Sequence, residues 1–500
     1  MKPVVIPHKQ YQRFVLEQLP RYYTDSLLVL RHSDWPAIAK LWMTDLSRIA
    51  SLVNDSYSDK GRKPRDPIAL FRSFLLFLLT NPSIGLTAWV EELHRVPLYA
   101  ILSGFEPGDI PGIGTFYDLF PRLWNADTKH LKPKRQPKKK KKPKRGNKKG
   151  EKAPTATPAR VRRLIKRLMQ QDHSASTLPT DLLFEFFQTQ IASVSAELGL
   201  LGDLTALNVA GDGTPLVTAA FPRSKATCHC FRDGHRNCGH SRIFSQPDCD
   251  TGWDSSRERY FAGHHLYVLS ASDSPHDLPL YAKLQPASRH DSVSLVISSF
   301  EWQQRWTLGP IKRMLLDAAH DAQAIYEMLD EQGIEPFIDL NPRKKQHDTT
   351  KTDIPLSAQG VPTCPAGHPM KPNGYEKAHD RQKWRCPRAS STHNSCEQPC
   401  SHAKYGRTFH TYPKGNLRLH PRVLRDSTEW KLIYKRRTSV ERSNKRQKID
   451  YRLEAGRHRS RMMWYIRLYG IMICQHIDAW YAVRQDQLQS LKTTLFLTAA

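Results

Sequence analysis

Two aspartates follow apolar runs that are typical of buried strands. Asp212 lies in GDGTP, directly after the run LNVA, and Asp317 ends the run MLL. Carboxylates at the ends of neighbouring strands can meet at one edge of a mixed sheet, where their oxygens suit hard cations such as Mg²⁺. Taken singly, an aspartate after a strand is more simply a turn former or a helix N-cap. The pair together suggests a cation site.

A third aspartate, Asp321, competes with Asp317 for this role. It stands four residues later, where the next helical pattern begins, and therefore fits the N-cap of that helix. Asp317 ends the strand itself. We therefore assign the site position to Asp317.

A cation-rich segment, YKRRTSVERSNKRQK, surrounds a single glutamate, Glu441. A helix of about 100° per residue places four of its side chains within roughly 60° of one another. They are Tyr434, Arg437, Glu441 and Lys448. The simplest reading of Glu441 is an i, i+4 pair with Lys445 on a solvated face. A lone carboxylate among so many cations is better explained by a DNA phosphate brought to a metal centre.

These side chains need a mixed sheet to position them. Short, apolar and β-rich runs predict strands over 207–217, 265–271, 278–284, 311–317 and 335–340, with a helix over 322–333. The fold class is therefore α/β. Two segments rich in Cys, His, Pro and Gly interrupt this pattern as predicted insertions, one near 222–258 and one near 343–428.

The rest of the chain divides around a basic segment. Residues 1–128 are predicted to form a helical N-terminal domain, in which Asp66 and Pro67 begin a buried helix. Residues 129–157 are predicted to be a disordered linker, because 132–152 holds 13 Lys or Arg, one Glu and no large apolar residue. The catalytic domain is expected over 158–460 and a helical segment over 461–500.

The charge of the whole chain indicates a polyanionic partner. Its 500 residues carry 76 Lys and Arg against 48 Asp and Glu, a formal net charge of +28. The linker suits a solvated tether or nonspecific attraction to phosphate. Neither a secretory signal nor an apolar run long enough for a membrane span is visible. We therefore expect a cytoplasmic protein with no membrane partner.

Eight of the nine cysteines form two groups of four, one in each predicted insertion. Without an export signal, disulfides are not expected, whereas four thiolates suit structural Zn²⁺. Neither group has paired CxxC spacing, and a plain surface loop is the alternative. The second group, which resembles a degenerate zinc ribbon, is the better zinc candidate. It comprises Cys364, Cys386, Cys396 and Cys400.

The spacing Tyr-x2-Arg-x3-Glu-x6-Lys resembles the signature of bacterial insertion-sequence transposases of the DDE type. Asp212 in GDGT resembles the first acidic residue of that family, Asp317 in DAAHDA the second, and Glu441 the third. The N-terminal passages RKPRDPIALFRSFLLFLL and PGIGTFYDLFPRLW resemble the helical front domain of these proteins. One departure is that Ala319 and His320 stand where many relatives have Gly and an aromatic residue.

The resemblance implies an RNase H-like catalytic fold and a transposase that binds the ends of its element, cuts them and joins them to target DNA. Asp212, Asp317 and Glu441 would hold two Mg²⁺ or Mn²⁺ ions. Tyr434, Arg437 and Lys448 would bind the DNA end, and the DNA complex could contain a homodimer. The alternatives are an inactive DNA-binding descendant and a metal-dependent nuclease without strand joining. A bacterial, nucleoid-associated location is expected.

Overall fold

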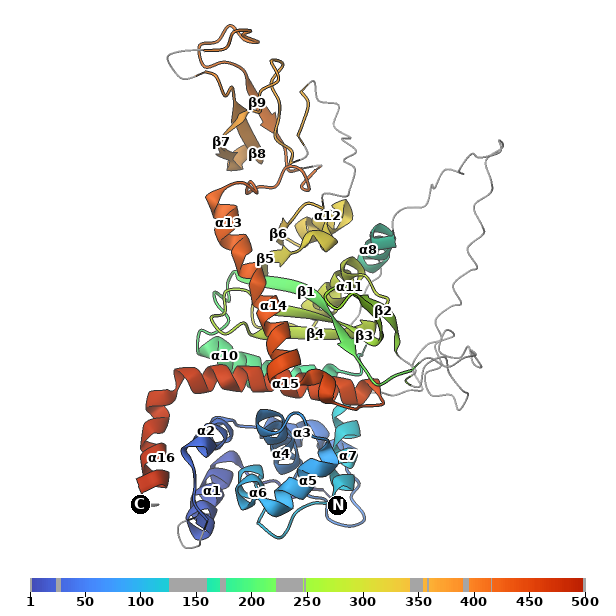
Figure 1. The fold of residues 1–500 in the computed structure, drawn as a ribbon, viewed down its shortest axis with the longest axis vertical. Coiled ribbons are helices and arrows are strands. Elements are labelled where there is room, and N and C mark those ends of the chain that lie inside the picture. Colours follow the sequence, from blue (N-terminus) through green and yellow to red (C-terminus); the bar gives the residue numbers. More distant parts are fainter. Residues whose placement is uncertain are drawn as a thin grey trace, which may run out of the picture.

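The computed structural model describes residues 2–23, 28–125, 160–170, 177–221, 246, 249–341, 354–357, 359–389, 395–414 and 416–497. The predicted linker and most of the first predicted insertion lie outside these ranges. Residues 8–119 form a layer of helices (Figure 1). They are α1 (His8–Tyr23), α2 (Trp35–Met43), α3 (Arg48–Val53), α4 (Pro67–Thr80), α5 (Leu86–Arg95), α6 (Pro97–Ser103) and α7 (Ile113–Leu119).

Helix α4 is the centre of this layer. The Asp66 side chain caps it by accepting a hydrogen bond from the Ile68 backbone N at 2.8 Å, and Pro67 is its first residue. Nearly every side chain of α4 is buried, which its continuous apolar sequence requires. The helix start predicted at Asp66 and Pro67 is confirmed.

A six-stranded sheet forms the second layer. Its strand order is β2–β3–β1–β5–β6, and β4 also pairs with β3. Neighbouring strands β1 and β5 are parallel, as are β5 and β6, whereas β3 is antiparallel to its partners. The strands are β1 (Leu207–Val217), β2 (Asp250–Asp254), β3 (Arg259–Ala271), β4 (Pro279–Pro286), β5 (Ile311–Leu316) and β6 (Glu335–Ile338). The predicted α/β class with a mixed sheet is confirmed.

Helices flank this sheet. Helix α11 (Asp291–Gln303) packs on β1, β3 and β4, while α12 (Gln323–Glu331) connects β5 to β6. The basic helix α8 (Arg160–Gln170) rests on α11 and α12 through Ile165. Before β1, the chain runs through α9 (Asp181–Phe186), a π-helical turn (Phe187–Ala192) and α10 (Ser193–Glu197).

The predicted insertions differ from one another. In the first, the range 222–258 reaches too far, because Asp250–Asp254 pairs with β3 as strand β2 of the main sheet. The second contains its own three-stranded sheet, which projects from the body of the molecule (Figure 1). Its strands are β7 (Lys371–Glu376), β8 (Arg381–Arg385) and β9 (Thr408–Thr411), and a small separate core includes Met370 and Trp384.

The cation-rich segment folds as one nearly continuous helical path. Helix α13 (Thr428–Tyr434) passes through a 3₁₀ turn (Lys435–Arg437) into α14 (Thr438–Lys445), which ends in a π-helical turn (Arg446–Asp450). Val440 is fully buried, and Ser439 Oγ lies 3.2 Å from Ser270 Oγ of β3. Small side chains thus bring α14 close to the sheet.

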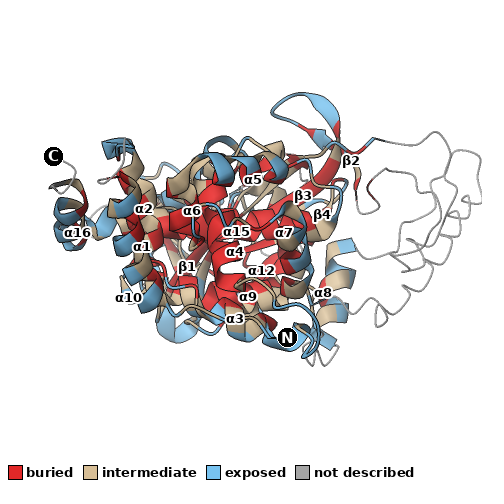
Figure 2. Cartoon of the chain, turned by 90° about the horizontal axis from the view of Figure 1, so that it is seen from below, coloured by how far each residue is buried: buried red, intermediate tan, exposed pale blue. Residues whose placement is uncertain are grey.

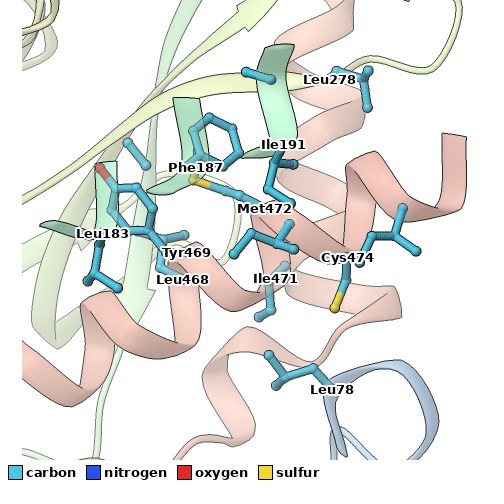
Figure 3. Packing of buried hydrophobic residues seen from close by; sticks show 14 of the residues in the cluster. Leu78, Leu183, Phe187, Ile191, Leu278, Leu468, Tyr469, Ile471, Met472 and Cys474 are labelled. Atoms are coloured by element: carbon cyan, nitrogen blue, oxygen red, sulfur yellow. The ribbon is translucent and has the colours of Figure 1, made fainter. Parts of the chain in front are cut away.

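Helix α15 (Arg461–Val483) lies between the helical layer and the sheet (Figure 1), and Figure 2 shows buried residues at its centre. Figure 3 shows Leu468, Ile471 and Met472 of α15 among apolar side chains from both layers. A Cβ added at Gly470 would lie 2.6 Å from Leu78 Cδ1 of α4, so the glycine permits this close approach. One continuous apolar core therefore joins the N-terminal helices to the sheet, and α16 (Gln485–Leu497) follows at the end.

Buried Arg467 adds polar links across the same junction. Its guanidinium donates to the backbone oxygens of Pro82 at 2.6 Å, Arg452 at 2.8 Å and Leu453 at 3.2 Å. These bonds connect α15 both to the turn after α4 and to the loop that follows the π-helical turn Arg446–Asp450. Within the described ranges, no helix is both long and apolar enough to cross a membrane.

Candidate active site

Asp212 lies in the middle of β1, opposite Val268 of β3. A Cβ at Gly211 would lie 2.7 Å from Tyr267 Oη, and one at Gly213 would collide with Asp291 and His265. The two glycines of GDG therefore allow side chains from β3 and α11 to pack against the strand beside Asp212. The Gly-Asp-Gly pattern in the sequence therefore has a steric cause.

The charge around Asp212 is poorly balanced. Burial, followed by the carboxylates of Asp291 and Asp317, raises the pKa of Asp212 to about 7. His320 and Arg437 act in the opposite direction but do not offset these effects. Such an excess of negative charge is what a cation would relieve.

Asp317 stands at the end of β5, which is parallel to β1 in the sheet. Its Oδ1 accepts a hydrogen bond from Ala319 N at 3.1 Å and lies 2.6 Å from His320 Nδ1. Burial acts to raise its pKa, but the contact with His320 and the bond from Ala319 hold the pKa of Asp317 below its ordinary value. Asp317 is thus the charged neighbour of Asp212.

Asp291, in the first turn of α11, is a further acidic neighbour that sequence reasoning did not identify. Its Oδ1 lies 3.0 Å from His265 Nε2. The two atoms are not aligned as a hydrogen bond, so we treat the pair as an electrostatic contact. Although burial acts to raise the pKa of Asp291, His265 holds it below its ordinary value. Nothing in the local sequence HDSVS distinguishes this residue, because its role depends on contacts with β1 and β3.

Glu441 projects from α14 over the same part of the sheet, since α14 packs on β1 and β3. Its Oε1 accepts a hydrogen bond from Arg437 Nη2 at 2.7 Å. Its side chain is 46 % exposed, while that of Arg437 is 18 % exposed. The ion-pair partner of Glu441 is therefore Arg437, four residues earlier, and not Lys445, which was the simplest alternative in the sequence.

Tyr434 and Lys448 link this helical path to β5 and β1. Tyr434 Oη donates to Leu316 O at 3.0 Å, one residue before Asp317. Lys448 Nζ donates to Pro215 O at 2.8 Å, three residues after Asp212. Burial, followed by the carboxylate of Asp339, raises the pKa of Tyr434. Both signature residues already have backbone partners in the protein alone.

A cleft of about 590 Å³ opens beside Asp212 and Glu441. Four cations and three carboxylates line it, and Glu454 is the third carboxylate. The remaining lining residues are Thr214, Arg257, Asn444, Lys445, Lys448, Ile449, Arg452 and Ala455. Two of the three predicted carboxylates therefore line one cleft, while Asp317 directly follows β5, the strand parallel to β1.

Asp321 has a different role from the one the sequence suggested. It is fully buried, and Arg418 Nε and Nη2 donate to its two carboxylate oxygens at 2.7 Å each. The backbone N of Asn341 donates to it as well, at 2.9 Å. Helix α12 has Ala322 at its N-cap and no side-chain cap. The N-cap interpretation is wrong, since Asp321 instead ties residues distant in sequence to the sheet.

The acidic residues suit a divalent cation by their chemistry, because carboxylate oxygens are hard ligands and Asp212 lies in unbalanced negative charge. Yet no three His, Cys, Asp or Glu side chains of the described residues are placed so that together they could hold a metal ion. Glu441 is engaged by Arg437. The hydrogen bond from Arg437 occupies Oε1, so recruiting that oxygen as a ligand requires it to leave Arg437.

The second cysteine group is likewise not assembled as a metal site within the described ranges. Cys364 and Cys386 are buried in the unit of β7–β9, where Cys364 packs with Met370 and Trp384. The Cys396 thiol instead bonds to Gln398 O at 3.3 Å. The predicted zinc site of Cys364, Cys386, Cys396 and Cys400 is thus not gathered here. In the first group, Cys228, Cys230 and Cys238 lie outside the described residues.

Residues 235–475 match the family model described as "Transposase DDE domain". This segment belongs to the DDE-type transposase domains. The matched segment contains Asp317 and Glu441 and begins after Asp212. A search of curated proteins finds no match to the chain.

The family places this protein among enzymes of nucleotidyl transfer, whose substrate is DNA and which generally use divalent metal ions. The predicted RNase H-like arrangement agrees with the mixed sheet and its flanking helices. Of the three acidic residues predicted from the sequence, Asp212 lies on β1 and Glu441 on α14, while Asp317 directly follows β5.

Proposed function

We propose that this transposase binds the ends of its mobile element and catalyses metal-dependent strand cleavage followed by strand transfer. The observation that carries the proposal is the convergence of three elements. Asp212 and Asp317 stand on adjacent parallel strands, and Glu441 lines the same basic cleft as Asp212. The pattern suits phosphoryl transfer, in which positioning and charge neutralisation supply most of the catalysis.

Asp212, Asp317 and Glu441 would hold two Mg²⁺ or Mn²⁺ ions. Bound there, the ions would supply activation of a water or a 3′-hydroxyl and stabilisation of the departing oxygen. Among the protein groups, Asp212 in the middle of β1 and Asp317 directly after β5 provide the carboxylates on the sheet side. Arg437 neutralises Glu441 until the site is loaded.

The cleft offers the cations that a DNA strand needs. Lys445 and Arg452 line it and have no acidic partner among the described residues. Arg257 and Lys448 also line it, although each pairs with Glu454. Cations of this kind bind phosphate oxygens and set the register of the DNA without reading its sequence. We infer that Tyr434, Arg437 and Lys448 orient the scissile end, with Tyr434 and Lys448 also holding the helix against the strands.

The test uses purified full-length protein and DNA that carries the ends flanking its own gene, with Mg²⁺ or Mn²⁺. Joining of the cut ends to a target DNA is the expected result, and Glu441→Gln should bind these ends without cutting them. Cleavage without joining would replace the proposal by a nuclease. Binding without cleavage would leave a DNA-binding descendant.

A further inference from the structure

His320 stands between the second catalytic aspartate and the interior of the protein. Its ring is fully buried. Nδ1 lies 2.6 Å from Asp317 Oδ1, and Nε2 lies 2.9 Å from Tyr267 Oη. With Nδ1 as donor to the carboxylate, Nε2 accepts the proton of the Tyr267 hydroxyl, and this tautomer satisfies both contacts. The three side chains form a linear chain of hydrogen bonds.

The surrounding backbone keeps this chain in place. Gly211 leaves room for Tyr267, because a Cβ there would lie 2.7 Å from its hydroxyl oxygen. The short 3₁₀ turn Ala318–His320 is held by Ser292 Oγ of α11, which donates to Ala319 O at 2.7 Å. Tyr267 is itself fully buried in β3. These contacts therefore hold the His320 imidazole in one orientation.

Both hydrogen bonds to Asp317, from Ala319 N and from His320, reach Oδ1. Within the described residues, Oδ2 receives none. One carboxylate oxygen is thus anchored while the other is free to serve as a ligand. Outer partners of this kind fix the orientation of metal ligands, and losing them typically costs about 10- to 100-fold in metal affinity or activity.

We propose that His320, supported by Tyr267, is a positioning residue that presents Asp317 to the metal centre. The proposal rests on the proposed function, in which Asp317 is a metal ligand. It also gives a role to the residue at which this chain departs from the glycine–aromatic pair of many relatives. A histidine supplies an oriented N–H donor, which an aromatic hydrocarbon ring cannot provide.

The experiment compares full-length His320→Ala, His320→Asn and Tyr267→Phe with the unaltered protein. Mn²⁺ binding without DNA is followed by titration calorimetry, and cleavage is measured at saturating DNA and over a range of DNA concentrations. His476→Asn is the matched control. His476 is also fully buried with two ring contacts, to Ser195 Oγ at 2.7 Å and Pro279 O at 2.9 Å, and it lies in α15.

We expect His320→Ala to weaken Mn²⁺ binding and to lower kcat by about 10- to 100-fold, with little change in KM for DNA. His320→Asn should recover part of this loss, because its amide retains a donor near Asp317. Tyr267→Phe should show a smaller loss in the same direction. His476→Asn should lower thermal stability but leave Mn²⁺ binding unchanged.

The proposal is overturned if His320→Ala binds Mn²⁺ and cleaves as the unaltered protein does, or if His476→Asn loses Mn²⁺ binding to the same extent. If His320→Ala does not fold, Tyr267→Phe decides, and unchanged Mn²⁺ binding in that variant is the contrary result. An unaltered protein that binds Mn²⁺ but does not cut DNA contradicts the proposed function alone. Absence of Mn²⁺ binding by the unaltered protein contradicts both.

Discussion

Asp317 and Glu441, which we propose act in one site, lie in regions that are built differently. Asp317 follows a central strand, and a buried histidine holds one of its oxygens. Glu441 lies on a helix surface, 46 % exposed, where Arg437 is its partner. The sheet side of the site is therefore set by the core, whereas the helix side depends on one partly exposed ion pair.

This difference suggests how the site could respond to metal and DNA. Partly exposed ion pairs contribute only about 0–1 kcal/mol, so a cation or a phosphate can displace Arg437 from Glu441 at little cost. Buried hydrogen-bond networks resist such rearrangement. We infer that Asp212 and Asp317 are already in position before metal and DNA bind. Glu441 would then complete the site when they bind.

The largest effect is expected from the helix side. Glu441→Gln removes a charged ligand but keeps its shape, and cleavage should fall by at least about 10³-fold because metal stabilisation of the transition state is worth several kcal/mol. Binding to element ends, followed by gel shift, should remain within a few-fold. Glu429→Gln, an exposed residue of α13, is the control. Cleavage near the unaltered rate in Glu441→Gln would remove Glu441 from the site.

A second substitution separates the two aspartates that compete in the sequence. Asp321→Asn breaks the buried pair with Arg418, which should lower the free energy of unfolding by about 3–5 kcal/mol. Chemical denaturation measures this loss. Asp330→Asn, whose pair with Arg422 is partly exposed, should change it by less than about 1 kcal/mol. If Asp321→Asn is as stable as the unaltered protein but cannot cut, Asp321 rather than Asp317 is the catalytic residue.

The release of Glu441 can be tested through its partner. Arg437→Gln should lower cleavage by about 10- to 100-fold, because charge-assisted contacts with the DNA end are lost, while Mn²⁺ binding should stay the same or improve. Calorimetry and cleavage rates provide the two readouts. Arg436→Gln, whose residue is 52 % exposed and pairs with Asp273, is the matched control. Weaker Mn²⁺ binding in Arg437→Gln would mean that the ion pair organises the site instead of restraining it.

The smallest effect is expected from the hydrogen bond that links Tyr434 to the end of β5. Tyr434→Phe removes the hydrogen bond to Leu316 O and should cost about 1 kcal/mol of stability. Cleavage should fall only a few-fold if the ring still packs on Trp430, with which it stacks at 5.8 Å. A loss of cleavage as large as that of Glu441→Gln would show that the hydroxyl contacts the reacting DNA directly.

The elements that carry the site could be predicted because their signals are local. Apolar runs before Asp212 and Asp317 predict strands, and the spacing from Tyr434 to Lys448 predicts a helix. The sequence did not reveal the 3₁₀ and π-helical turns that interrupt that helix. Strand β2 was also missed, since DTGWD is poor in β-forming residues and is extended by pairing with β3.

Contacts between residues distant in sequence explain the other differences between the predictions and the structure. Asp321 looked like a helix cap because its local sequence permits one, but Arg418 lies 97 residues away in the chain. Asp291 and His265 carry no local signal, since they meet only when α11 packs on β3. For His320 the position after Asp317 was visible, while its partner Tyr267, 53 residues earlier, was not.

The central claim is that Asp212, Asp317 and Glu441 form one metal centre. Replacing Mg²⁺ by Fe²⁺ in the DNA complex and generating hydroxyl radicals cuts the backbone near the bound ion, and the fragments can be mapped by mass spectrometry. We predict cuts clustered around residues 212, 317 and 441 that disappear together in Asp212→Asn. Cuts confined to one of these segments, or unchanged in Asp212→Asn, would contradict the claim.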